Sequence, residues 1–315
     1  ISSLQLTAKG NGGRKSVRLD NGTLITTVLN GDKLYIMKSV NDGATWSTLD
    51  SASVGVQDVA IATDGTYFWV ARILSSAIWV AVWTEDEWIG EIKVDSGYTS
   101  LAGISLVANK SKTEVHLAVS ATTSAYKYHN IYYVKGYVTK GTGWINWDVP
   151  QQWTKENISS NTKVLFPSVE VDKDDNPVIA CFSWTEFSSG VYPRYTMQAL
   201  SRRKTGFGQG VRYSTQYSTI YATGSNTELQ YSPNMLFVPP EITGTPYGRL
   251  WVTWTGDNSG STTSHLWVNY SDNGGSTWGN PTKLYTAGSY KGADNPVLTA
   301  SKDGKVSIIY SQQTA

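Results

Sequence analysis

Residues 39–47 (SVNDGATWS) and 271–279 (SDNGGSTWG) are two copies of one short pattern at opposite ends of the chain. Each copy follows an apolar segment of alternating character, KLYIMKS or HLWVNYS, and therefore predicts a turn between two β-strands. The same unusual turn made twice indicates a repeat architecture. The matching positions are Ser39, Asn41, Gly43, Thr45 and Trp46 in the first copy and Ser271, Asn273, Gly275, Thr277 and Trp278 in the second.

On either side of these turns a strand–turn–strand unit recurs along the chain, with starts near residues 14, 58, 103, 167, 232 and 295. Asn-Gly and Asp-Gly pairs between the apolar runs indicate tight hairpins, because these residues accept the positive φ of primed turns. The spacing is close to the length of a four-stranded propeller blade. The sequence therefore predicts an all-β, six-bladed β-propeller over residues 1–315. A two-sheet sandwich and a β-solenoid are the alternatives.

The sixth unit contains only two predicted strands. We expect residues 2–8 (SSLQLTA) to complete it, so that the last blade is closed by the N-terminal strand and no sheet edge stays open. Because the chain begins with Ile1, we also expect it to be processed or to be part of a larger protein.

Composition narrows the class of protein and of partner. The chain has 40% hydrophobic, 12% aromatic and 16% charged residues, which argues against disorder and against coiled coils. A net charge of +1 predicts no nucleic-acid partner. No apolar run approaches the roughly 18 residues of a membrane span, so we expect no membrane insertion. The single cysteine, Cys181, lies in an apolar run and is expected in the core.

The two turns resemble the Asp box, or BNR repeat, of the sialidase superfamily of propellers, whose pattern is Ser-x-Asp-x-Gly-x-Thr-Trp. Both copies have asparagine, Asn41 and Asn273, in place of the family's aspartate. The resemblance implies that the turns lie between the third and fourth strands of their blades, on the rim opposite the active site. Trp46 and Trp278 would then pack between blades and take no part in chemistry.

We therefore expect the functional site among the loops of the other rim, since loops on a rigid scaffold carry most sites. Long polar and aromatic loops favour a glycan-sized site, because flat rings stack on sugars and fixed polar groups orient hydroxyls. The candidate catalytic residues are Asp58, Glu186, Glu228, Asp257 and His129. The candidate ligand-binding residues are Arg14, Arg194, Trp184, Trp254, Tyr128, Tyr192 and Tyr231.

Three chemistries remain open on that rim. Glycoside hydrolysis needs two carboxyl groups, which the candidate aspartates and glutamates supply. Sialidase activity is disfavoured: the resemblance carries over only Arg14 of the arginine triad, and no Ile-Pro follows it. Polysaccharide lyase chemistry needs a base and a cation, for which His129 and Arg194 are the candidates. His116 and His265 are expected to be structural.

No metal-ligand spacing and no phosphate-binding glycine loop are present in the sequence, so no metal and no cofactor are predicted. The leading hypothesis is a glycan-binding propeller with a carbohydrate partner, acting outside the cell as a secreted, cell-surface or virion host-attachment domain. The alternative is a carbohydrate-active enzyme, either a glycoside hydrolase or a lyase. A protein-docking platform is the third.

Overall fold

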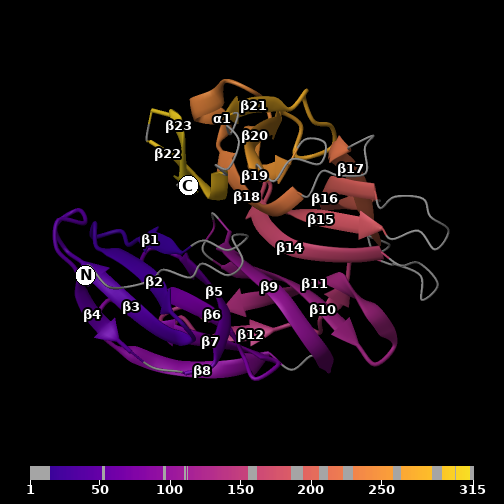
Figure 1. The fold of residues 1–315 in the computed structure, drawn as a ribbon. Helices are drawn as coiled ribbons and strands as arrows, with labels where there is room; N and C mark the ends of the chain where they lie inside the picture. Colours follow the sequence, from indigo (N-terminus) through magenta and orange to yellow (C-terminus); the bar gives the residue numbers. More distant parts are fainter. Residues whose placement is uncertain are drawn as a thin grey trace.

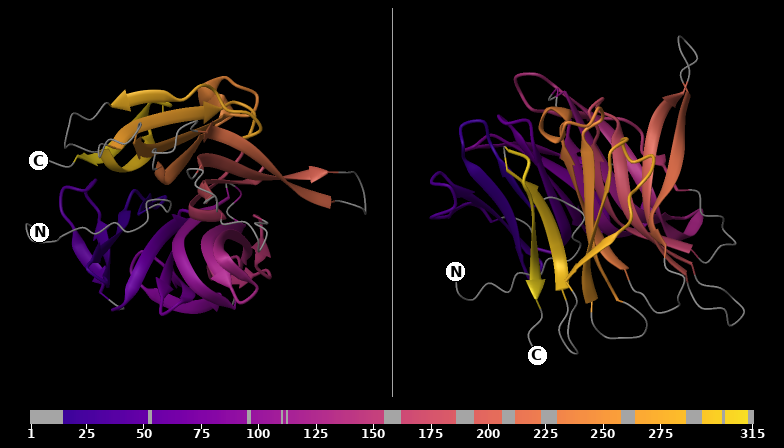
Figure 2. Two further views of the ribbon diagram at one scale, coloured as in Figure 1. Left: turned by 45° about the vertical axis from the view of Figure 1, so that its right-hand side comes forward. Right: turned by 90° about the horizontal axis from the view of Figure 1, so that it is seen from above.

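The computed structural model describes residues 15–51, 54–94, 97–109, 111, 113–154, 162–185, 194–205, 212–222, 230–257, 264–285, 293–301 and 303–312. These residues form antiparallel sheets that follow one another around a common axis (Figure 1), so the predicted all-β propeller is confirmed. Two further views show the same succession, from the indigo strands through magenta to yellow (Figure 2). No helix within these ranges is long and apolar enough to cross a membrane.

The first three blades contain the first thirteen strands. Blade 1 consists of β1 (Ser16–Arg18), β2 (Leu24–Asn30), β3 (Lys33–Ser39) and β4 (Ser47–Asp50). Blade 2 consists of β5 (Val56–Thr63), β6 (Phe68–Leu74), β7 (Ala77–Trp83) and β8 (Trp88–Val94). Blade 3 is a five-stranded sheet of β9 (Tyr98–Ala108), β10 (Glu114–Thr123), β11 (Tyr126–Val138), β12 (Ile145–Trp147) and β13 (Gln151–Gln152).

Two further blades and one smaller sheet complete the described strands. Blade 4 consists of β14 (Thr162–Val171), β15 (Pro177–Thr185), β16 (Arg194–Thr205) and β17 (Arg212–Ala222). Blade 5 consists of β18 (Gln230–Val238), β19 (Arg249–Asp257), β20 (Ser264–Ser271) and β21 (Thr282–Tyr285), with the one-turn helix α1 (Pro240–Thr243) in its first turn. The smaller sheet pairs β22 (Ala293–Ala300) with β23 (Val306–Gln312).

The prediction of six blades is wrong for the described residues, which form five blades. The sixth unit is the two-stranded sheet β22–β23, which packs its first strand against blade 5. It lacks a third strand among the described residues. The closing strand that the sequence predicted, residues 2–8, lies outside them.

Burial along the strands follows from how many neighbours each blade has. In β2 of the first blade, residues alternate strictly between buried and half-buried, as expected for a sheet with one covered face. In β10 of the third blade, eight consecutive residues are buried, because blades cover both of its faces. The hydrophobic core is accordingly a series of layers, each between two adjacent blades.

The first strand of each blade lies next to the first strand of the following blade, around the axis. The five inner strands β5, β9, β14, β18 and β22 all contain a register shift against their second strands. In three of them the shift contains a proline, Pro167, Pro233 or Pro296, which is tolerated because a bulge needs no ladder donor there.

Adjacent inner strands are joined by a repeated contact, in which a buried side-chain oxygen accepts a hydrogen bond from a backbone N–H of the next strand. Because an inner strand is the edge of its sheet, such an N–H has no partner within its own blade. The donors and acceptors are Ile104 N and Asp58 Oδ2 (3.0 Å), Val169 N and Ser105 Oγ (3.0 Å), Met235 N and Ser168 Oγ (2.9 Å), and Leu298 N and Asn234 Oδ1 (2.8 Å).

Replacing Asn234 tests this contact. We expect Asn234→Leu to lower the free energy of unfolding by about 1–3 kcal/mol, because the buried Leu298 N–H loses its acceptor. Urea denaturation measures the loss. The control is Asn146→Leu on an exposed position of β12, which should change stability by less than about 0.5 kcal/mol. Equal losses in the two variants would contradict the role given to Asn234.

The two Asp-box-like turns have nearly identical internal hydrogen bonds. In the first, Asn41 Oδ1 accepts from Thr45 N (2.9 Å), and Asn41 Nδ2 donates to Thr45 Oγ1 (2.8 Å). Ser39 Oγ accepts from Gly43 N at 2.9 Å. The equivalent contacts of Asn273, Thr277, Ser271 and Gly275 measure 2.7–2.9 Å. The asparagine amide thus both accepts and donates within the turn, which explains why it can occupy the position of an aspartate.

The two tryptophans of these turns have different surroundings. Trp278 Nε1 donates to Ser218 Oγ of blade 4 at 3.0 Å, and its ring packs on the core layer between blades 4 and 5. Trp46 Nε1 instead donates to Gly43 O of its own turn, at 3.0 Å. Trp278 is therefore a wedge between blades, whereas the described contacts of Trp46 are local.

We expect this difference to appear as unequal losses of stability. Trp278→Ala removes an inter-blade contact and should cost about 3 kcal/mol, whereas Trp46→Ala should cost less than half of that. The free energies of unfolding in urea provide the measurement. If Trp46→Ala proved as costly as Trp278→Ala, the distinction between the two turns would be refuted.

Candidate functional site

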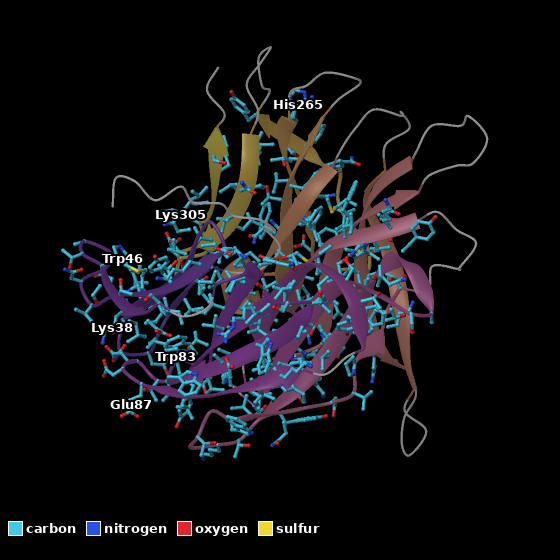
Figure 3. The ribbon with its side chains drawn as sticks, turned by 60° about the horizontal axis from the view of Figure 1, so that its bottom comes forward. Lys38, Trp46, Trp83, Glu87, His265 and Lys305 are labelled. Carbon is cyan, nitrogen blue, oxygen red and sulfur yellow. The ribbon has the colours of Figure 1, made fainter. Side chains whose placement is uncertain are left out.

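The two rims of the propeller carry different kinds of connection. First-to-second and third-to-fourth strand turns share one rim, which we call the turn rim; for example, Asp20 N donates to Gly65 O at 2.8 Å, and Lys38 Nζ lies 3.1 Å from Glu85 Oε1. The opposite rim, the loop rim, joins second to third strands and successive blades. Figure 3 shows Trp46 and Lys38 on one side of the molecule and His265, the second residue of β20 at the loop rim, on another.

At the loop rim, His129 lies between blades 3 and 4. Its Nε2 is 3.4 Å from Ser100 Oγ of the inner strand β9. Burial lowers the pKa of His129, and the positive charge of Lys163 at the start of β14 lowers it further. The imidazole is therefore neutral at neutral pH and can accept a proton, and Lys163 is close enough to act on it electrostatically.

Buried hydrogen bonds hold the strand that carries His129. The side chain of Asn130, the next residue, is 1% exposed, and its Oδ1 accepts from Thr154 Oγ1 at 3.0 Å. Thr154 Oγ1 in turn accepts from Ile131 N at 2.8 Å. Asn130 and Ile131, the two residues that follow His129 on β11, are held by these hydrogen bonds. The backbone at His129 is therefore well supported.

The strand register of blade 4 places further predicted residues beside Lys163. Lys163 pairs with Trp184, and Thr185 pairs with Arg194, at the loop-rim ends of β14, β15 and β16. The side chains of Trp184 and Arg194 lie outside what the structure describes. The backbone nevertheless brings an aromatic residue and two basic residues to one end of this blade.

The carboxylate of Asp58 forms hydrogen bonds that join neighbouring blades. Its Oδ1 accepts from Val59 N (2.8 Å) and from Lys15 Nζ (3.1 Å), and its Oδ2 accepts from Ile104 N. Burial raises the pKa of Asp58, against the opposing charge of Lys15. Its oxygens all face donors of the protein, so the arrangement is that of a structural carboxylate.

The other predicted site residues are distributed as follows. Trp254 is fully buried and stacks on Trp267, with ring centroids 6.4 Å apart, so it belongs to the core and does not face a ligand. Tyr128 is half-buried on β11, next to His129. Tyr231 and Asp257 lie on β18 and β19 near the loop rim, but their side chains are outside the described set. Residues Arg14, Glu186, Tyr192 and Glu228 lie outside the described residues altogether.

A cavity of about 580 Å³ opens on the turn rim, between blades 3 and 4. Its wall includes Glu114 and His116 of β10, Tyr133 and Lys135 of β11, and Asp175 of the first turn of blade 4. We call it the His116 pocket. The sequence placed no site on this rim.

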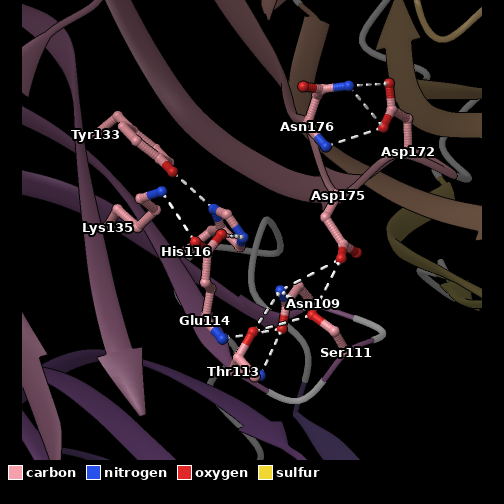
Figure 4. Close-up of polar contacts among 10 residues, drawn as sticks. All are labelled: Asn109, Ser111, Thr113, Glu114, His116, Tyr133, Lys135, Asp172, Asp175 and Asn176. Carbon is pink, nitrogen blue, oxygen red and sulfur yellow. Dashed lines mark hydrogen bonds and ion pairs between the residues drawn. The ribbon is translucent and has the colours of Figure 1, made fainter.

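The floor of the His116 pocket is a chain of polar contacts (Figure 4). His116 is 1% exposed, and its Nδ1 lies 2.6 Å from Tyr133 Oη. Its Nε2 makes no hydrogen bond within the described chain and is 3.8 Å from Glu114 Oε2. Glu114 Oε1 accepts from Lys135 Nζ at 3.0 Å. Burial lowers the pKa of His116 to about 3, aided by the charge of Lys135, so the ring is neutral.

The first turns of two blades meet above this floor. Asp175 Oδ2 accepts from Ser111 Oγ (3.2 Å) and from Asn109 Nδ2 (3.4 Å), which joins blade 4 to blade 3. Among the described residues, no group of three or more His, Cys, Asp or Glu side chains is placed to hold a metal ion.

Sequence reasoning missed this pocket, although a pattern for it exists. Glu114 and His116 alternate with apolar residues on β10, and Tyr133, Lys135 and Tyr137 do the same on β11. The register pairs Glu114 with Tyr137 and His116 with Lys135, so these side chains share one face. Alternating polar residues on two successive strands of an interior blade would have indicated a polar face toward the next blade.

Comparison with known proteins establishes the fold. No protein-family model matches the chain, and no curated protein matches it. An α-L-arabinanase of Penicillium chrysogenum complexed with arabinobiose is 14% identical, with a TM-score of 0.54 over 99% of this chain and 95% of that chain. The α-L-arabinofuranosidase of Fusarium graminearum with arabinobiose is 14% identical, with a TM-score of 0.56 over 96% and 89%.

A Hadza microbial sialidase is 15% identical to this chain, with a TM-score of 0.51 over 89% of this chain and 60% of that chain. At such identities the likeness is one of fold. The resemblance to sialidase-type propellers, which the two turns predicted, is therefore confirmed in the architecture.

The buried His116 predicts a pH dependence of stability. Because its pKa falls from 6.5 in the unfolded chain to about 3 in the folded one, the unfolded state binds more protons between these values. The stabilisation is complete above pH 6.5 and is lost as the pH falls toward 3. At a pH of about 4.5 the loss should be roughly 2–3 kcal/mol.

Urea denaturation of the wild type and of His116→Gln, at pH values of about 7.5 and 4.5, checks this expectation. The variant cannot titrate at this position, so its stability should fall less on acidification. An identical fall in both proteins would show that His116 is not the group responsible.

Proposed function

We propose that this protein is a carbohydrate-active enzyme that cleaves a glycan at the loop rim, with glycoside hydrolysis as the leading chemistry. The observation that carries the proposal is the group formed by His129 of the third strand β11, Ser100 of the inner strand β9 and Lys163 of the inner strand β14, at the loop-rim ends of two neighbouring blades. Similarity in fold to an arabinanase and an arabinofuranosidase, both complexed with arabinobiose, favours an enzyme over the non-enzymatic glycan-binding module that leads the sequence hypotheses.

Glycoside hydrolysis requires a carboxylic acid that protonates the leaving oxygen and a carboxylate that acts as base or nucleophile. Since the oxygens of Asp58 are occupied by Lys15 and backbone donors, we place the reacting pair among Glu186, Glu228 and Asp257. The sequence predicts all three on the loop rim. Neutral His129 would orient a sugar hydroxyl there, and arabino-oligosaccharides are the first substrates to test.

A specific observation also favours a second candidate, polysaccharide lyase chemistry. A neutral imidazole beside an ammonium group suits removal of the proton next to a uronate carboxylate. In that reaction His129 takes the proton, the electron pair forms a carbon–carbon double bond, and the glycosidic oxygen leaves. Lys163 would stabilise the charge that develops on the carboxylate.

Product analysis separates these reactions. We expect incubation with arabinan, a neutral polymer, to release fragments that have gained one water for each bond cleaved. Polygalacturonate is the anionic comparison; fragments with an unsaturated end and no added water would establish a lyase instead. Retention of glycans without cleavage of any of them would contradict the proposal and restore the glycan-binding hypothesis.

Single substitutions then identify the residues. At least one of Glu186→Gln, Glu228→Gln and Asp257→Asn should lower kcat by about 100-fold or more with binding retained, because general acid–base catalysis contributes at least that much. Glu87→Gln, on the exposed turn rim, is the matched control and should retain full activity. If all three amide variants remain active while His129→Ala is inactive, lyase chemistry replaces hydrolysis.

The docking platform and the extracellular, surface or virion location remain predictions from the sequence. A glycan-cleaving enzyme acting on polymers is consistent with action outside the cell, and fractionation of the source organism would test this.

A further inference from the structure

The His116 pocket is separate from the loop-rim group. Both lie between blades 3 and 4, but Tyr133 in the pocket is four residues beyond His129 along β11, or about 13 Å at the usual strand rise. The apolar layer of Val107, Ala118, Ile131 and Val164 belongs to the same interface. A ligand in the pocket would therefore not touch the loop-rim residues, and the inference below does not depend on the function proposed for them.

The contacts of His116 define what a ligand must offer. Tyr133 Oη lies 2.6 Å from Nδ1, and Glu114 Oε2 lies 3.8 Å from Nε2. We assign the tautomer in which Tyr133 donates to Nδ1 and Nε2 carries the proton, because the negatively charged Glu114 carboxylate lies on the Nε2 side of the ring. The pocket thus presents a buried N–H donor and a carboxylate acceptor, separated by a distance too long for a direct hydrogen bond.

One kind of group satisfies both at once. A hydroxyl oxygen at about 2.8 Å from each atom can accept from His116 Nε2 and donate to Glu114 Oε2, since both distances are normal for hydrogen bonds. A cation could not accept from the imidazole N–H. A carboxylate could not donate to Glu114, and the negative charge of a carboxylate or a phosphate would be repelled by it. The geometry therefore fits a hydroxyl group, which a sugar supplies in place of a water molecule.

The charges around the pocket also favour a neutral ligand. Its described wall carries four carboxylates, of which Glu114 is paired with Lys135 and Asp174 with the neighbouring Lys173, so that Asp148 and Asp175 remain as the excess negative charge. An anionic ligand is disfavoured by this excess. Carboxylates and amides are also good partners for sugar hydroxyls.

The mouth of the pocket supplies apolar surface. Tyr137 is 43% exposed and Val149 is 82% exposed, and both line the cavity. Lys135 Nζ lies 4.9 Å from the centroid of the Tyr137 ring, which restrains the ring. An exposed aromatic beside convergent polar groups is typical of a small-molecule site, and the cavity volume falls in the usual range for one.

We propose that the His116 pocket is a second carbohydrate-binding site, on the rim opposite the loops, which takes a neutral sugar residue and rejects uronates and other acidic sugars. One hydroxyl bridges His116 and Glu114, and the sugar ring lies against Tyr137. Bound there, a polymer would be held to the protein independently of the loop rim.

The three histidines of the chain make the site observable by NMR. In protein labelled with ¹⁵N-histidine, the His116 signals are those lost in His116→Gln. We expect a protonated Nε2 whose signal shifts saturably on addition of D-galactose, L-arabinose or lactose, with Kd on the order of 1–10 mM. D-Galacturonate differs from galactose only in its carboxylate, and it should bind at least about tenfold more weakly.

Two variants locate the binding. Tyr137→Ala, at an exposed position, should keep the fold and weaken binding by about fivefold or more. Glu114→Gln should weaken it further, because the hydroxyl loses a charged acceptor. Asp303→Asn, exposed in the turn between β22 and β23, is the control and should bind like the wild type.

Three outcomes would overturn the proposal. They are no shift of the His116 signal with any of the neutral sugars at about 100 mM, equal binding of galacturonate, and a saturable shift that Tyr137→Ala and Glu114→Gln leave unchanged. None of them bears on cleavage at the loop rim, which product analysis measures separately.

Discussion

The contact between neighbouring inner strands is the constraint on which the propeller depends. An inner strand is the edge of its sheet, and half of its backbone donors face away from the blade. A buried N–H without a partner costs about 1–3 kcal/mol, so packing blades around an axis requires an acceptor at each junction. Asp58, Ser105, Ser168 and Asn234 supply it. Apolar side chains at these four positions would leave the backbone N–H groups of the next inner strand without hydrogen-bond acceptors.

This constraint also limits which side chains are available for chemistry. Asp58 looks like a catalytic carboxylate by position and by its raised pKa, yet its oxygens accept from Lys15, Val59 and Ile104. The residues that remain available for catalysis lie at the strand ends of the loop rim. His129 and Lys163 come from different blades, so their mutual influence exists only when blades 3 and 4 are packed together.

The interface between blades 3 and 4 is polar at both ends and apolar in the middle. His129 and Lys163 are at its loop-rim end, the His116 pocket is at its turn-rim end, and residues such as Val164 and Ile179 fill the layer between. Blade 3 contains the longest described strand, β11, and a fifth strand, β13, beside Tyr132 and Tyr133. The same two blades can therefore present two separate surfaces to one polymer.

The strands, the repeat and the two turns could be predicted from the sequence, because hairpin chemistry and alternation are local: Asn41 and Asn273 make their turns with residues only a few positions away. The number of complete blades became clear from the packed strands alone, since β22 and β23 pair with no third strand among the described residues. The same holds for the burial of Trp254, for the hydrogen bond of Trp278 to another blade where the described hydrogen bond of Trp46 is local, and for the place of His116 in a pocket. These outcomes depend on which blade lies beside which, and periodicity along a strand carries no information about the neighbour across the interface.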